Sequence, residues 1–149
     1  MNETQSNNDN QIKPVEFVEN EELNKYVKEL DRDVSLTVTN LREKSLLVST
    51  IRSKWLSYYM KEKENMQRIQ NTKAKILKAK MSDPSANTSV LRVKSEEALS
   101  QNDERLQKLS KLMQMTKENI DFIERAMNIL SDFVWQIKNA IEIMKLQSI

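Results

Sequence analysis

The chain has 149 residues, enough for one ordinary domain, and it contains no glycine, cysteine or histidine. These absences exclude glycine-rich phosphate loops, cysteine-based zinc sites, disulfides and histidine-dependent nucleophilic sites. The net charge is only +2, and neither a signal peptide nor a membrane-spanning segment is indicated. We therefore expect a non-enzymatic cytoplasmic protein that needs no cofactor or metal and contacts no membrane. A Mg or Ca site made of carboxylates alone is the alternative that composition leaves open, although no EF-hand spacing is present.

The small net charge conceals a segregation along the chain. The segment Met1 to Glu22 holds six acidic residues and only one basic residue, Lys13, for a net charge of −5, so the remainder carries +7. Residues 1–19 are also poor in apolar side chains, which leaves little to offset the entropy of ordering. This composition predicts a disordered acidic tail over residues 1–19.

A short helix is predicted over Glu21–Asp31, with Asn20 as its N-cap. The β-branched run Val34 to Thr39 should end it. Residues 20–81 would then form an N-terminal helical region that also contains a second, much longer helix.

The second helix should begin after Asn40, where Glu43 has the spacing of a capping box. It should end near Met81, because Pro84 disfavours helical geometry at the residue before it. A helix of this length forms a rod of roughly 60 Å. A loop over residues 82–94 is predicted to follow.

A third helix should begin between Ser89 and Ser95, within a C-terminal region of residues 95–149. Twelve positions from Leu106 to Met144 are spaced alternately by three and four, and eleven of them are apolar. A second apolar stripe lies beside this seam, so the apolar arc is too wide for one partner helix to cover. We expect the third helix to hold a homo-oligomeric helical ring or bundle, through Met113, Ile120, Ile123, Met127, Leu130, Val134, Ile137 and Ile141. The alternative is a three-helix bundle within one chain, covered by the first helix.

The second helix is basic, with nine cationic and two acidic residues between Arg52 and Lys80. Four of the cations are spaced by seven residues and so line one face of the helix: Lys54, Lys61, Arg68 and Lys75. No acid occurs between Glu64 and Asp83. A solvated helix face normally interleaves glutamates with lysines. The pattern therefore favours a phosphate-binding stripe, with a plain solvated face as the alternative. The predicted DNA contacts are Lys54, Lys61, Arg68, Lys73, Lys75, Lys78, Lys80 and Tyr59.

The remaining aromatic side chains indicate packing more than stacking. Trp55 and Tyr58 fall on the apolar side of the second helix, so we expect them in the core. Trp135 lies in the apolar third helix, and a structural role is expected for it too.

Three segments of the second helix resemble the UvsY family of phage recombination mediators: Ser53-Lys54-Trp55-Leu56, Met66-x-Arg68-Ile69 and Leu77-Lys78-Ala79-Lys80. The segment Glu29 to Val34 resembles a further element of that family. The resemblance implies that Lys78 and Lys80 contact single-stranded DNA, with Lys80 standing where the family has arginine. It also implies rings of identical subunits, and contacts with a RecA-like recombinase and a single-strand DNA-binding protein.

The function implied is that of a single-stranded DNA-binding recombination mediator in the host cytoplasm. Such a protein loads a RecA-like recombinase of the UvsX type onto DNA coated by single-strand-binding protein. It would serve homologous recombination and recombination-dependent replication and repair. The alternative from the residues alone is a structural coiled-coil scaffold or adaptor, whose basic helix binds an acidic protein partner.

Overall fold

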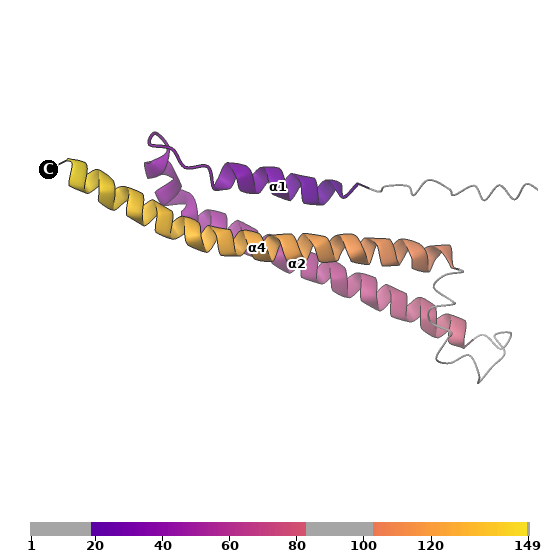
Figure 1. Ribbon diagram of the computed structural model, residues 1–149. Helices are drawn as coiled ribbons and strands as arrows, with labels where there is room; N and C mark the ends of the chain where they lie inside the picture. The colour runs from indigo at the N-terminus through magenta and orange to yellow at the C-terminus, as the bar shows by residue number, and fades with distance from the viewer. Residues whose placement is uncertain (1–18, 83–102, 149) are drawn as a thin grey trace, which may run out of the picture.

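The computed structural model describes residues 19–82 and 103–148, in which the regular secondary structure is helical and no strand occurs. The helices are α1 (Glu21–Asp33), α2 (Leu41–Met81) and α4 (Glu104–Gln147). Figure 1 shows the two long helices lying side by side, with the short α1 alongside them. The predicted all-α fold with one short and two long helices is confirmed.

The start of α1 was predicted correctly, and its capping residue has a second role. The Asn20 side-chain oxygen accepts the Leu23 backbone N–H at 3.1 Å. The same side chain donates from Nδ2 to Asn119 Oδ1 at 2.9 Å and to the Met115 carbonyl at 3.3 Å. One asparagine therefore caps α1 and ties it to α4.

The long helix α2 begins at Leu41 and ends at Met81, as predicted, but the capping box is wrong. The Asn40 side chain makes no capping bond to α2. Instead its oxygen accepts the Thr37 N–H at 2.7 Å, and its amide donates to the Ser35 carbonyl at 3.1 Å. Local turn bonds of this kind compete with capping, and here they shape the connection from α1.

The core lies between α2 and α4, which run antiparallel. Ile123, Leu130 and Ile137 of the predicted α4 seam are buried in one cluster with Trp55 of α2 and Tyr26 of α1. Trp55 has no exposed surface, and Tyr58 packs partly buried against the cluster, which confirms the expected packing of both rings. Packing against α1 and α2 of the same chain therefore buries much of the apolar seam of α4.

Several sequence predictions fall on residues outside the described part of the chain. These are the tail up to residue 18, most of the predicted loop, and the expected start of the third helix. Within the described residues, the C-terminal helix α4 begins at Glu104. Asp103 before it has an extended backbone and acts as the N-cap, since its side chain accepts the Arg105 N–H at 2.8 Å. No helix in the described ranges is both long and apolar enough to cross a bilayer.

Trp135 does not pack in the core, although a structural role was expected for it. Its side chain lies opposite the core on α4 and is 64% exposed. The Lys138 ammonium lies 4.9 Å from its ring centroid, a cation–π contact that partly covers the indole. An apolar helix can therefore still carry an exposed aromatic side chain, and the sequence alone did not show that Trp135 lies on the exposed side.

Candidate nucleic-acid interface

The basic row of α2 consists of the four cations at seven-residue spacing, Lys54, Lys61, Arg68 and Lys75. Its first member, Lys54, is paired with two acids of α1. Its Nζ lies 2.6 Å from Asp33 Oδ2 and 2.7 Å from Glu29 Oε1, both on α1. Burial alone lowers the pKa of Lys54, but the hydrogen bonds to Asp33 and Glu29 outweigh it and raise the pKa above its usual value. Asp33 also accepts the Trp55 indole N–H at 2.8 Å. Lys54 therefore fastens α1 to α2.

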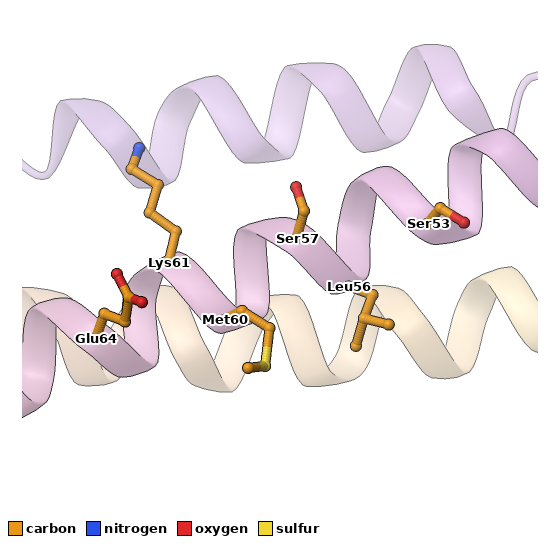
Figure 2. Close-up of a pocket in the computed structure, with 6 residues that line it drawn as sticks. All are labelled: Ser53, Leu56, Ser57, Met60, Lys61 and Glu64. Atoms are coloured by element: carbon orange, nitrogen blue, oxygen red, sulfur yellow. The ribbon is translucent and has the colours of Figure 1, made fainter.

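Lys61, the next member of the row, also faces α1. Its Nζ lies 3.4 Å from Glu22 Oε1; the Lys61 side chain is 58% exposed and that of Glu22 is 39% exposed. Figure 2 shows Lys61 extending toward the neighbouring α1, away from Leu56 and Met60. An exposed pair of this kind contributes about 0–1 kcal/mol. Lys61 is thus only weakly held, and a stronger anion can compete for it.

The cations in the second half of α2 are differently placed, on the part of this helix that extends beyond α1 (Figure 1). Arg68, Lys75 and Lys78 are exposed. Arg68 makes one long, exposed pair with Glu64 at 3.7 Å, and Lys75 and Lys78 pair with no acid in residues 19–82 or 103–148. Lys73 is half-buried. The described acids therefore leave most of the positive charge of this part of α2 unpaired, so it can attract an external anion.

Lys80 connects the end of α2 to the start of α4. Its Nζ lies 2.5 Å from Asp103 Oδ2, and both side chains are mostly buried. The Arg105 guanidinium lies 3.2 Å from the same oxygen. The contact fixes which part of α4 lies beside the basic end of α2.

Three cations of α4 were missed by the sequence prediction. Arg105, Lys108 and Lys111 are exposed, and the antiparallel packing places the first turns of α4 beside the last turns of α2. Their sequence signal is the same as in α2, since no acid occurs from Arg105 to Lys117. We call the combined surface the basic end. It consists of Arg68, Lys73, Lys75, Lys78, Lys80, Arg105, Lys108 and Lys111.

Tyr59 is only partly available for base stacking. It is half-buried against the core cluster. Its hydroxyl donates to Glu124 at 3.4 Å, and Lys63 Nζ lies 5.5 Å from the ring centroid. The eight residues of the basic end are all cationic and include no aromatic side chain, a composition that suits contacts with a phosphate backbone more than base readout.

The predicted oligomerisation residues are placed mainly inside the chain. Ile120, Ile123, Leu130 and Ile137 are buried, and the others are half-buried: Met113, Met127, Val134 and Ile141. The exposed large apolar side chains lie elsewhere. They include Leu46, Leu56 and Met60 on α2, and Ile129, Ile143 and Leu146 on α4.

Comparison with known structures relates this fold to one phage protein. One crystal form of the bacteriophage T4 recombination mediator protein UvsY superposes with a TM-score of 0.70 at 22% identity, covering 84% of this chain and 98% of that chain. A second crystal form gives 0.67 at 22% identity, with 85% and 97% covered. At this identity the likeness establishes the fold.

Sequence comparison establishes the family. No curated protein matches the chain significantly on its own. The profile of the family described as "Recombination, repair and ssDNA binding protein UvsY" matches residues 29–148, which include the end of α1 and all of α2 and α4. The chain therefore belongs to the UvsY family of recombination, repair and single-stranded DNA-binding proteins.

Proposed function

We propose that this chain is a non-enzymatic recombination mediator whose basic end holds the backbone of single-stranded DNA. It loads a RecA-like recombinase onto a strand already covered by a single-strand-binding protein. The recombinase and the coating protein are its protein partners. The proposal rests on membership of the UvsY family and on one observation, the meeting of two acid-free basic runs at one end of the helical pair.

The two runs supply charge without base-reading geometry. Residues 65–82 and 105–117 contain no acid, and the Lys80–Asp103 contact brings the ends of these runs together. Lysine and arginine side chains bind phosphates with weak sequence preference, and the affinity falls as salt rises. A mediator needs this property, because it must accept any strand and then release it.

Several subunits acting together would make the individual weak contacts effective. Once one subunit holds the strand, each further contact is intramolecular, so overall affinity rises without any single strong bond. A coating protein that follows the strand through basic grooves and stacked bases is displaced more readily by such an assembly. The mechanism therefore requires self-association.

We place the self-association surface on exposed apolar side chains rather than on the buried seam. On α2, Leu56 is 50% exposed and Met60 is 58% exposed. Together with Ser53 and Ser57 they line a shallow depression of about 470 Å³ (Figure 2). Exposed apolar patches of this kind commonly mark contacts between proteins. We expect these residues to meet the exposed apolar residues of α4, among them Ile129 and Ile143, on a second copy.

Replacing Leu56 and Met60 together by glutamate should lower the mass of the assembly at micromolar concentration. Helicity should be retained, because neither side chain is in the core. Sedimentation and circular dichroism measure the two quantities. The double variant Gln67→Glu with Gln70→Glu adds the same charge at exposed positions of the same helix and should leave the mass unchanged. A wild-type chain that is monomeric under these conditions, or an unchanged mass in the Leu56/Met60 variant, would contradict this assignment.

The mediator function is tested with the DNA-dependent ATPase of a RecA-like recombinase. The strand is first saturated with the cognate coating protein, which suppresses recombinase loading. Adding this chain should shorten the lag or raise the ATPase rate. Tight DNA binding without any relief of the suppression would leave a plain DNA-binding scaffold as the better description.

A further inference from the structure

Asp103 is held between cations from two different helices. Its Oδ2 atom is 2.5 Å from Lys80 Nζ of α2 and 3.2 Å from the Arg105 guanidinium of α4. The second carboxylate oxygen accepts from Arg105 Nε at 3.4 Å. Lys80 and Arg105 therefore converge on one anionic oxygen.

The contacts of Asp103 favour the charged carboxylate over the protonated acid. Hydrogen bonds from Lys80 and then from Arg105 hold its pKa well below the usual range of a carboxyl group. Its side chain is only 9% exposed, whereas that of Arg105 is 69% exposed. Arg105 can therefore turn toward an incoming anion while Asp103 sits beneath it.

The surroundings of this carboxylate are positive. Lys78 lies nearby in sequence on the exposed side of α2, and Lys108 follows Arg105 by one turn of α4. Of the described acids near this junction, Glu104 is highly exposed and makes only a long pair with Lys108 at 3.6 Å. The α4 N-terminus adds a further partial positive charge. Among the described acids at this junction, Asp103 is the one that contacts both Lys80 and Arg105.

We propose that Lys80 and Arg105 form a binding site for a backbone phosphate of single-stranded DNA, which Asp103 occupies while the chain is free of DNA. The proposal rests on the DNA-binding function above and assigns Arg105 and Asp103 to it. Carboxylate and phosphate oxygens accept the same charge-assisted hydrogen bonds from lysine and arginine. A phosphodiester therefore replaces the Asp103 carboxylate by exchange of one anion for another.

This exchange suits a protein that must release its strand. When the phosphate leaves, Asp103 again pairs with Lys80 and Arg105, so neither cation is left without a partner. The internal carboxylate lowers the affinity for DNA and makes handover to a recombinase easier. Asp103 is accordingly a regulator of affinity, and Lys80 and Arg105 are the contacts.

The test is the substitution Asp103→Asn, which removes the charge and keeps the cap. Asparagine and aspartate serve almost equally as N-cap residues, so α4 should still begin at Glu104. Binding of a labelled oligodeoxythymidylate should become tighter. The logarithmic salt slope should steepen by up to about 0.7 for each bound subunit, the amount expected for one neutralised phosphate. Unchanged or weaker binding by Asp103→Asn would overturn the proposal.

Two further variants separate this mechanism from a general charge effect. Glu104→Gln removes the same charge at the adjacent exposed position and should change the slope little; an equal gain there would contradict a specific site. Asp103→Asn combined with Arg105→Gln should lose most of the gain, and retention of the full gain would remove Arg105 from the site. A wild-type chain that binds no DNA overturns both this inference and the proposed function, whereas wild-type binding with no gain in Asp103→Asn overturns this inference alone.

Discussion

Ile123→Asp should unfold the chain rather than release folded subunits. Ile123 is completely buried in the cluster that joins α2 and α4. Losing the isoleucine packing costs about 2–5 kcal/mol, and an unpaired buried carboxylate adds several kcal/mol more. Together these approach or exceed the 5–15 kcal/mol that stabilises a typical domain. Circular dichroism should show lost helicity or a much lower melting temperature.

Asn139→Asp is the matched control for this experiment. It adds the same carboxylate at an exposed position of α4, so the melting temperature should stay close to that of the wild type. A contrary result would be an Ile123→Asp chain that keeps its helicity and cooperative melting but sediments as a monomer. That result would place Ile123 between chains, as the seam alone had led us to expect.

The sequence was informative about the helices because their signals are local. Apolar spacing, Asn20 and Pro84 together fixed most of the helix boundaries, and the structure places α1 and α2 within two residues of the prediction. The capping box failed for a local reason too, since the Asn40 side chain bonds back to Thr37 and Ser35. Sequence spacing shows that a bond is possible but not which of two competing bonds forms.

The partner of each apolar stripe was harder to predict. A seam of alternating three and four spacing does not reveal whether its partner is another helix of the same chain or a second copy. Here α2 of the same chain covers Ile123 and Leu130, and α1 adds Tyr26 and Leu30 to the cluster. The helix α1 has only 13 residues. Its length alone did not indicate how far its aromatic and polar side chains contribute to covering α2 and α4.

The candidate interface shows the same limit for charge. Seven-residue spacing correctly placed Lys54, Lys61, Arg68 and Lys75 along α2, but the acids that meet Lys54 and Lys61 come from a different helix. Pairs such as Lys54–Asp33 and Lys80–Asp103 join residues that are distant in the chain. They depend on the packing of α1 and α4 on α2, so no local pattern predicted them.

The largest effect on DNA binding is expected from removing the three cations on the outer surface of α2. Arg68, Lys75 and Lys78 are exposed, and the described carboxylates leave them available for phosphates. Replacing all three by alanine should weaken binding of single-stranded DNA and reduce the logarithmic salt slope by about 2 for each bound subunit, at about 0.7 for each lost contact. The fold should persist because none of the three is in the core.

Two controls distinguish lost contacts from lost charge and lost stability. The exposed residues Lys25, Lys28 and Lys145 lie away from the basic end, and changing all three to alanine removes the same charge with little expected change in slope. Lys54→Met removes a cation from the same row but breaks its bonds to Asp33 and Glu29. It should lower the melting temperature and leave the salt slope close to that of the wild type.

The central claim, that the basic end is the DNA-binding surface, is tested most directly by the salt dependence of affinity for an oligodeoxythymidylate. Wild type and the Arg68/Lys75/Lys78 variant are compared over one range of salt concentrations. We expect the variant to bind more weakly at low salt and its plot to be shallower by about 2 for each bound subunit. Superimposable plots for the two proteins would contradict the account and move the DNA-binding surface elsewhere on the molecule.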